Sequence, residues 1–352
     1  MIDFNHLDNL LDSGQELNDE EIQWTCALLL SSTVSDEYKA EILIKLHLRG
    51  ETAAEIAGFA REFKALAVDP AISLDDCGGT LMDVCGTGAD KLNTFNISTA
   101  VMFVVAAAGV CVAKHGNRSI TSQCGGADVL EGLGIKIDHS PDKLRGLIMT
   151  HGLAFFFAPL FHPAFKQIAP VRKMLAAKGY HSIFNFLGPL LNPAPINYQL
   201  VGLSNHGLLE KYAQTLRLLG RERAWVAHGF IDENKSQGMD EISIFGPTQI
   251  ADICLETVDF SEVDFREHFT VDRTWTIDSL KGGDAKLNAS IVVDILKGQE
   301  MNSPRTKIVL ANAAAALLIA KKVKTYKDGI VTAKEMIFSG KAFAKLQALR
   351  AA

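Results

Sequence analysis

The chain has few of the features that mark secreted, membrane-spanning or zinc-binding proteins. Its six cysteines are scattered and form no Cys-x-x-Cys pair, which disfavours zinc and indicates reduced thiols in a cytosolic protein. The longest apolar run, residues 100–113, contains a glycine and is shorter than the roughly 20 residues of a membrane-spanning helix. The first residues lack a basic start and an apolar run, so we expect no signal peptide and a cytoplasmic location.

The chain also lacks an excess of positive charge and the common hydrolase motifs. The net charge of −6 offers no favourable field to nucleic acid or to an anionic membrane, so we expect neither as a partner. The sequence contains no Gly-x-Ser-x-Gly and no His-Glu-x-x-His pattern. These absences argue against a nucleophile-elbow hydrolase and against a zinc protease.

The N-terminal part of the chain has the capping signals of helices and no strand-like alternation. Asn18-Asp19-Glu20-Glu21 and Thr52-Ala53-Ala54-Glu55 have the pattern of capping boxes, and Ser35 precedes another apolar helical run. Pro70 and the turn-rich Asp75-Asp76-Cys77-Gly78-Gly79 then end the pattern. At 352 residues the chain can hold more than one domain, so we predict a small helical domain over residues 1–75.

From Leu81 onward, short apolar runs alternate with helical stretches. This rhythm predicts an α/β domain over residues 80–352, with a mainly parallel central sheet flanked by helices. The expected strands are Leu81–Val84, Val110–Ala113, Ala154–Phe157, Gln199–Leu203, Ala224–Ala227 and Glu241–Phe245. The expected helices include Ala127–Leu133, Pro141–His151, Leu208–Leu219, Ile308–Lys321 and a last helix from Ala333 to about Leu349.

The stretch from Asp83 to Asp128 has the pattern of a phosphate cradle. A short strand leads into a glycine loop, a helix begins near Ser98, and the next strand delivers Lys114 and a histidine. Glycines allow backbone N–H groups to approach a ligand closely, and a helix N-terminus is partially positive. We interpret the two loops together, with the lysine, as a site for phosphate groups.

Other polar residues have both functional and structural interpretations. The adjacent carboxylates Asp240-Glu241 favour a cation such as magnesium, although most such pairs are solvated surface residues. Arg172 suits the recognition of a carboxylate, or a place on the solvated surface. We expect His162 to satisfy a backbone group, and His228 ends a strand where it could line a cleft.

An ordered set of motifs along the chain resembles the anthranilate phosphoribosyltransferase family, of the nucleoside phosphorylase and phosphoribosyltransferase fold. The set comprises Gly86-Thr87-Gly88-x-Asp90, Asn96-Ile97-Ser98-Thr99, Lys114-His115-Gly116-Asn117-Arg118, Ala127-Asp128, Arg172, Phe184-Asn185-x-Leu187-Gly188-Pro189-Leu190-x-Asn192-Pro193 and Asp240-Glu241. The resemblance covers nearly the whole chain. It implies transfer of the phosphoribosyl group of phosphoribosyl pyrophosphate (PRPP) to the amine of anthranilate, in tryptophan biosynthesis.

The resemblance also implies roles for individual residues. Those expected to bind PRPP are Gly86, Gly88, Asp90, Thr94, Asn96, Ser98, Thr99, Lys114 and Gly126. Those expected to line the anthranilate path, with the arginine facing its carboxylate, are Gly86, His115, Asn117, Arg172 and Pro189. Two magnesium ions are expected at Ser98, Asp240 and Glu241. No general base is assigned, because the weakly basic aromatic amine can attack without prior deprotonation.

The family also implies an arrangement of the parts. Residues 167–190 are expected to pack with the helical domain, so that the active site lies in the cleft between the domains. A homodimer formed through the helical domain is the expected assembly.

The chain departs from the family pattern mainly in the glycine loops. Ala89 and Lys91 stand where glycines are usual, and we expect Ala89 to adopt a non-glycine conformation or to carry strain. Cys124 and Gly126 replace two hydroxyl residues, which leaves backbone N–H groups to contact phosphate. The segment from Arg172 to Ile183, where His181 stands in place of a common arginine, and the loop 230–237 are longer than usual.

Two alternatives remain at this point. A pyrimidine nucleoside phosphorylase shares the expected architecture, but its own phosphate and base signatures are not evident. A non-catalytic, nucleic-acid-binding relative of the same fold would have a basic surface and would lack the anthranilate residues. This chain is acidic and retains Arg172, His115 and Asn117.

Overall fold

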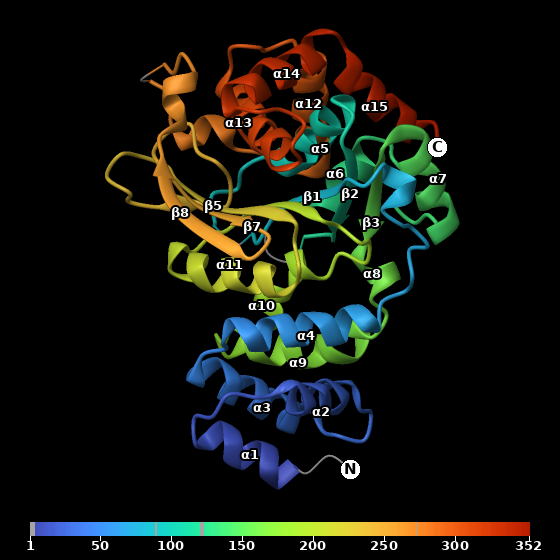
Figure 1. The fold of residues 1–352 in the computed structure, drawn as a ribbon, viewed down its shortest axis with the longest axis vertical. Coiled ribbons are helices and arrows are strands. Elements are labelled where there is room, and N and C mark those ends of the chain that lie inside the picture. The colour runs from blue at the N-terminus through green and yellow to red at the C-terminus, as the bar shows by residue number, and fades with distance from the viewer. Residues whose placement is uncertain (1–3, 89, 120–122, 273) are drawn as a thin grey trace.

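The computed structural model describes residues 4–88, 90–119, 123–272 and 274–352. Figure 1 shows a block of helices at one end, a twisted sheet in the middle and a layer of C-terminal helices beyond it. The helical block comprises α1 (Phe4–Asp12), α2 (Asp19–Leu30), α3 (Asp36–Arg49), α4 (Ala53–Ala65) and, from much later in the chain, α9 (Phe165–Ala177). In the described part of the chain, none of the helices is long and apolar enough to cross a membrane.

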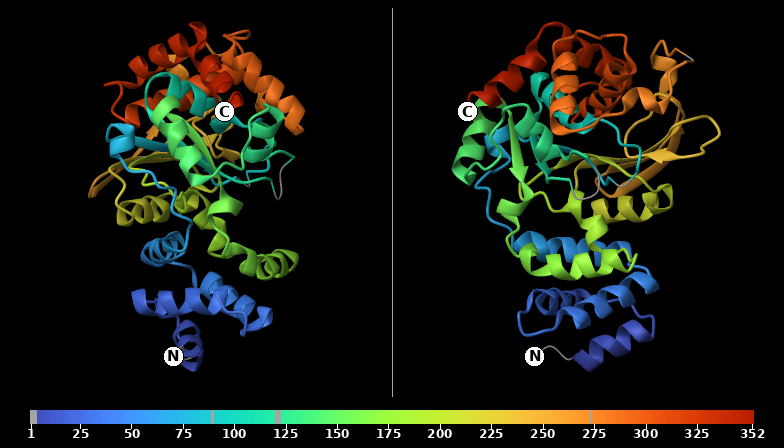
Figure 2. Two further views of the ribbon diagram at one scale, coloured as in Figure 1. Left: turned by 90° about the vertical axis from the view of Figure 1, so that its right-hand side faces the viewer. Right: turned by 180° about the vertical axis from the view of Figure 1, so that it is seen from behind.

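The helices of the block begin at the predicted capping residues. Asn18 and Thr52 each accept a hydrogen bond from a backbone N–H three residues later, and Glu21 and Glu55 complete the two capping boxes. These bonds satisfy N–H groups that a helix start leaves without intrahelical partners. Helix α9 packs against α3 and α2, although more than a hundred residues separate them in sequence (Figures 1 and 2).

The central sheet has the strand order β3-β2-β1-β4-β5-β7-β8, and the short β6 pairs with β5. The first five strands of that order are parallel, whereas β7 and β8 are antiparallel additions. The strands are β1 (Leu81–Gly86), β2 (Cys111–Gly116), β3 (Leu153–Phe157), β4 (Tyr198–Gly202), β5 (Arg223–Phe230), β6 (Gly238–Met239), β7 (Thr248–Cys254) and β8 (Thr257–Val263). The predicted α/β fold with a mainly parallel sheet is confirmed. Because parallel strands end at the same edge, the loops after β1, β2 and β4 meet there.

Helices cover both faces of the sheet. The remaining helices are α5 (Ile97–Ala107), α6 (Gly126–Gly132), α7 (Pro141–His151), α8 (Ala158–Phe161), α10 (Phe184–Leu187), α11 (Leu209–Leu218), α12 (Ala285–Leu296), α13 (Pro304–Ile319), α14 (Tyr326–Phe338) and α15 (Lys341–Arg350). One apolar core joins the sheet to α5 and the C-terminal helices. A second core runs from the opposite face, through α11, into the helical block. Apolar packing therefore attaches the helical block to the sheet.

Two sequence-based predictions of secondary structure were wrong. Residues 241–245 form no strand. Asn312 of α13 hydrogen-bonds both the N–H (3.0 Å) and the C=O (3.2 Å) of Ile242. A side chain there takes the place of the backbone hydrogen bonds that a neighbouring strand would make. The apolar alternation of this segment reflects burial, and the real strand, β7, begins at Thr248. The predicted last helix is two helices, α14 and α15, because Gly340 adopts a φ of 75° between them.

Candidate active site

The loop that carries Asp240 and Glu241 packs against the ends of β1 and β4. The Oδ2 atom of Asp240 accepts a hydrogen bond from the backbone N–H of Gly88 at 2.7 Å. A Cβ atom on Gly86 would lie 2.3 Å from the same oxygen, and one on Gly202 would lie 1.6 Å from the Asp240 carbonyl oxygen. Both positions therefore require glycine, and the carboxylate pair is held beside the glycine loop.

Asp90, Asp240 and Glu241 form a group of closely spaced carboxylates. Burial, and then the like charge of Asp90, raise the pKa of Asp240 to about 7. Burial also raises the pKa of Glu241 well above its usual range, and the charge of Asp240 raises it further. Asp90 Oδ2 is buried and accepts no bond from an N–H group among the described residues. Such a group is stabilised by a cation or by protons.

Hard oxygen ligands of this kind suit magnesium. Among the described residues, however, no cluster of three or more acidic, histidine or cysteine side chains is arranged to enclose a metal ion by itself. Magnesium commonly completes its coordination with water and substrate phosphates. The carboxylates thus fit one side of a magnesium site that needs oxygens from a ligand.

Lys114 brings a buried positive charge to the same place. Its Nζ donates to the Val84 carbonyl at 2.5 Å and to the Ser98 hydroxyl at 3.1 Å. The ammonium group lowers the pKa of Asp83 and of Glu241, in each case against the larger effect of burial. The lysine therefore links β1, the start of α5 and the carboxylate group.

The glycine loop after β1 is braced from several sides. Gly88 and Lys91 adopt φ angles of 68° and 61°, so the lysine that replaces a usual glycine keeps a left-handed backbone. Asn96 at the start of α5 donates to the Cys124 carbonyl (3.1 Å) and accepts from Asn288 (2.9 Å). Both ends of its amide are thus engaged within the protein. The expectation for Ala89 lies outside the described residues.

Thr94 and Thr99 complete the predicted PRPP group. Thr94 forms an isolated antiparallel bridge with Lys281, which fixes the loop against a later segment. Thr99 is buried on α5, and a Cβ on Gly126 would lie 3.8 Å from its hydroxyl oxygen. Thr99 and Gly126, one from each of the two regions, therefore lie side by side.

The second loop, after β2, is organised around Asp128. Its Oδ2 accepts from the backbone N–H of Ser119 (3.0 Å) and of Gly125 (2.8 Å). Asn117 is exposed, and its Oδ1 accepts from the backbone N–H of Arg118 at 2.7 Å. The amide nitrogen of Asn117 forms no hydrogen bond within the described ranges.

His115 and His162 form the wall on the predicted anthranilate side. Their ring centres are 5.3 Å apart in an edge-to-face arrangement. Burial, and then the nearby His162, lower the pKa of His115 to about 3, so the ring is neutral at pH 7. His162 donates from Nε2 to the Leu191 carbonyl at 2.7 Å, which confirms its predicted structural role. His228 likewise donates to the Leu203 carbonyl at 2.7 Å.

Arg172 lies on α9, apart from the histidines. Its guanidinium stands 5.7 Å from the centre of the Phe184 ring, and burial lowers its pKa. No ion pair to Arg172 occurs in the described part of the chain. Phe184, Phe165 and His162 form successive ring contacts that lead from Arg172 to His115. The structure therefore connects these two residues through an aromatic row, without direct contact.

Pro189 and two residues outside the predicted set also shape the site. The Pro189 carbonyl accepts from Gln199 of β4 at 2.6 Å, which ties its turn to the sheet. Sequence reasoning missed the roles of Gly202 and Asn288. A glycine near the end of a predicted strand indicates that another backbone segment approaches closely there, and Gly202 is such a glycine. Nothing local to Asn288 marked it as the partner of Asn96.

Comparisons with known proteins agree over almost the whole chain. Residues 78–343 match the family described as "Glycosyl transferase family, a/b domain", and residues 6–67 match its "helical bundle domain". The chain is 41% identical to anthranilate phosphoribosyltransferase of Desulfatibacillum aliphaticivorans over 98% of this chain and 97% of that one. It is 40% identical to that of Persephonella marina, over 97% and 96%.

Solved structures show the same similarity. The anthranilate phosphoribosyltransferase of Thermus thermophilus superposes with a TM-score of 0.86, at 33% identity, and the match covers 98% of each chain. The Saccharomyces cerevisiae enzyme in complex with PRPP and Mg has a TM-score of 0.84 at 24% identity, covering 98% of this chain and 96% of that one.

Proposed function

Because the chain belongs to the anthranilate phosphoribosyltransferase family, we propose that it transfers the phosphoribosyl group of PRPP to the amine of anthranilate. The products are N-(5-phosphoribosyl)anthranilate and pyrophosphate, in tryptophan biosynthesis. The observation that carries this function is the near full-length similarity to enzymes of that name. The packing of Asp240 against the glycine loop, which brings a carboxylate beside the expected phosphate site, supports the same assignment.

The PRPP side of the proposed site is the edge of the sheet where the loops after β1 and β2 meet. We assign to it Gly86, Gly88, Asp90, Thr94, Asn96, Ser98, Thr99, Lys114 and Gly126. Glycine backbone N–H groups can approach phosphate oxygens closely. The ammonium group of Lys114 is already buried in the free protein, so binding a phosphate there adds no further cost of removing the lysine from water. Asn96 and Thr94 shape the loop through the contacts they make within the protein.

Ser98, Asp240 and Glu241 are proposed to hold two magnesium ions. Structures of the S. cerevisiae relative contain Mg. The carboxylates here fit that cation, because burial and then the charge of a neighbouring carboxylate raise their pKa values, and a bound cation would offset both effects. When bound, magnesium would neutralise the pyrophosphate that leaves the ribose.

The anthranilate side is proposed to consist of Gly86, His115, Asn117, Arg172 and Pro189. Arg172, which forms no ion pair in the described ranges, suits the carboxylate of anthranilate. The neutral His115 ring suits the uncharged aromatic ring of the same substrate. The main tasks of these residues are to position the amine and to exclude water. We assign no general base, since the amine attacks the ribose carbon as its neutral form.

We propose a small domain of residues 1–75, with 167–190 packed onto it, and a large domain of residues 80–352. The active site would lie in the cleft between them, and the enzyme would be a cytoplasmic homodimer. The second core, which continues from the sheet into the helical block, supports close coupling of the two domains.

The test of the proposed function is the consumption of anthranilate, followed by the loss of its fluorescence. We expect consumption only when both PRPP and magnesium are present, with pyrophosphate released in equal amount. Folded protein that leaves anthranilate unchanged under these conditions would refute the proposal.

A further inference from the structure

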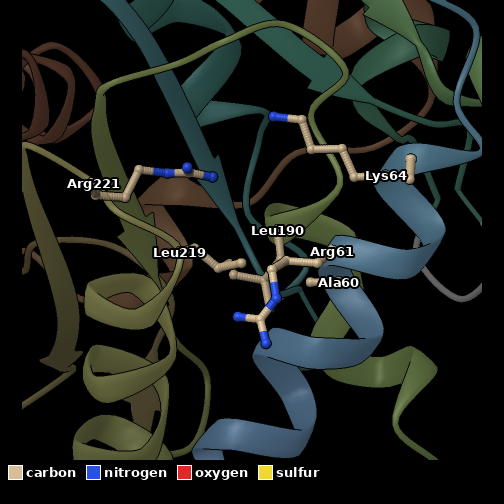
Figure 3. A pocket seen from close by; sticks show the side chains of 7 residues that line it. Ala60, Arg61, Lys64, Leu190, Leu219 and Arg221 are labelled. Atoms are coloured by element: carbon tan, nitrogen blue, oxygen red, sulfur yellow. The ribbon is translucent and has the colours of Figure 1, made fainter. Parts of the chain in front are cut away.

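A cavity of about 300 Å³ lies where the helical block meets the sheet, and no residue of the glycine loops lines it. Helix α4 forms one side of it, and the segments around Leu190 and from Leu219 to Arg221 form the other (Figure 3). Its lining residues are Ala60, Arg61, Lys64, Ala65, Leu190, Leu219 and Arg221. The lining thus contains three basic residues and no carboxylate.

Lys64 and Arg221 reach toward one another from opposite sides of this cavity, whereas the guanidinium of Arg61 turns away from them (Figure 3). Lys64 Nζ donates to the Ala194 carbonyl at 3.1 Å, which leaves two of its three N–H groups without a partner in the described ranges. Arg221 Nε donates to Gln199 at 3.0 Å, and its terminal nitrogens form no hydrogen bond with any described residue. Several donors therefore converge on the same space.

The two charges are expensive to hold in this position. The side chain of Arg221 is more than nine-tenths buried, at 6% exposure. Burial, and then the charge of Arg221, lower the pKa of Lys64 to about 8. Burial likewise lowers the pKa of Arg221 to about 10, although Asp83 opposes that effect. An anion in the cavity would relieve the repulsion between the two cations.

We propose that this cavity binds the phosphate group of a small phosphate monoester. A phosphate dianion has acceptor oxygens for both Lys64 and Arg221, and charge-assisted hydrogen bonds of this kind are among the strongest in proteins. The volume exceeds what one phosphate needs, and the apolar walls formed by Ala60, Leu190 and Leu219 would contact the organic part. The site is distinct from the PRPP site proposed above, and it does not depend on the catalysed reaction.

Because the cavity lies between the helical block and the sheet, a bound phosphate ester would contact both. Gln199 donates to the Pro189 carbonyl (2.6 Å) and accepts from Arg221 (3.0 Å). Leu190, which lines the cavity, follows Pro189 directly in sequence. A ligand bound to Arg221 would therefore be connected, through the hydrogen bonds of Gln199, to the Pro189 turn assigned to the anthranilate side.

Calorimetric titration with inorganic phosphate and with phenyl phosphate tests the proposal. Lys64→Gln should weaken the binding of both probes by about tenfold or more, because it removes a charged donor. Lys324→Gln, which changes an exposed lysine elsewhere, should leave both affinities unchanged. Equal affinity in the wild type and in folded Lys64→Gln would overturn the proposal, and equal affinity for the two probes would overturn the assignment to an ester.

Crystals of the wild-type chain soaked in selenate provide an independent measurement, which does not require the variant to fold. Anomalous density between Lys64 and Arg221 is the expected result. Density at the glycine loops with none in the cavity would overturn the proposal. Turnover of anthranilate by the same wild-type preparation separates this outcome from a failure of the proposed function.

Discussion

The carboxylate of Asp240 occupies the space that a side chain on Gly86 would need. A Cβ at position 86 would stand 2.3 Å from Asp240 Oδ2, far inside van der Waals contact. The same oxygen accepts from Gly88 N–H, so the glycine loop and the carboxylate fix each other. The geometry of the proposed PRPP and magnesium sites thus depends on one pair of residues more than 150 positions apart in the chain.

Gly86→Ala should therefore displace Asp240 and reduce turnover by about 100-fold, the usual effect of moving a positioned group by about 1 Å. The measurement is the rate of anthranilate consumption, with the melting temperature as a check on folding. Gly146→Ala is the matched control, since nothing lies near its Cβ on exposed α7, and it should raise stability by about 0.5–1 kcal/mol. A Gly86→Ala enzyme with wild-type activity would contradict the arrangement.

Removing the charge of Asp240 should raise the stability of the free protein and reduce its stabilisation by ligand. Asp240→Asn removes a carboxylate whose pKa burial and Asp90 raise, so the free protein should melt at a higher temperature near pH 7. The stabilisation of the wild type by magnesium with PRPP, about 2.7 kcal/mol at a hundred times the dissociation constant, should largely disappear. Asp259→Asn, an exposed carboxylate on β8, should retain that stabilisation. Full ligand stabilisation in Asp240→Asn would argue against the magnesium role.

Whether a feature of the fold or the site could be predicted from the sequence depends on how far apart in the chain the residues that determine it lie. Capping boxes at Asn18 and Thr52 and the strand with its glycine loop are local, so their residue patterns sufficed. The failed strand at residues 241–245 was apolar because α13 covers it, and Asn312 supplies its hydrogen bonds from 70 positions away. The contacts of Gly202 and Asn288 likewise arise only when distant loops meet. Local patterns contain no information about such partners.

Removing the Arg172 side chain should impair the use of anthranilate more than that of PRPP. Arg172→Ala should raise KM for anthranilate about tenfold or more, because a charge-assisted contact to its carboxylate is lost, and leave KM for PRPP little changed. Lys173→Ala, the exposed neighbour on α9, is the control. Steady-state kinetics with each substrate varied in turn measures the difference. An unchanged KM for anthranilate would remove Arg172 from the site.

The buried pair His115 and His162 should make the fold sensitive to mild acid. Burial lowers the pKa of both rings, that of His115 to about 3, whereas an unfolded histidine titrates near 6.5. Between these values the unfolded chain binds more protons, so the free energy of unfolding falls as the pH drops below about 6.5. One such histidine contributes a slope of up to about 1.4 kcal/mol per pH unit.

His115→Gln should remove that contribution and flatten the pH dependence of stability between about pH 5 and 6.5, above the range in which most carboxylates titrate. Urea unfolding at a series of pH values measures the slope for each protein. His181→Gln is the control, because this histidine is exposed to solvent, and it should leave the slope as in the wild type. A His115→Gln protein whose stability falls as steeply as the wild type in this interval would show that His115 is protonated in the folded state, contrary to the neutral ring assigned to the anthranilate wall.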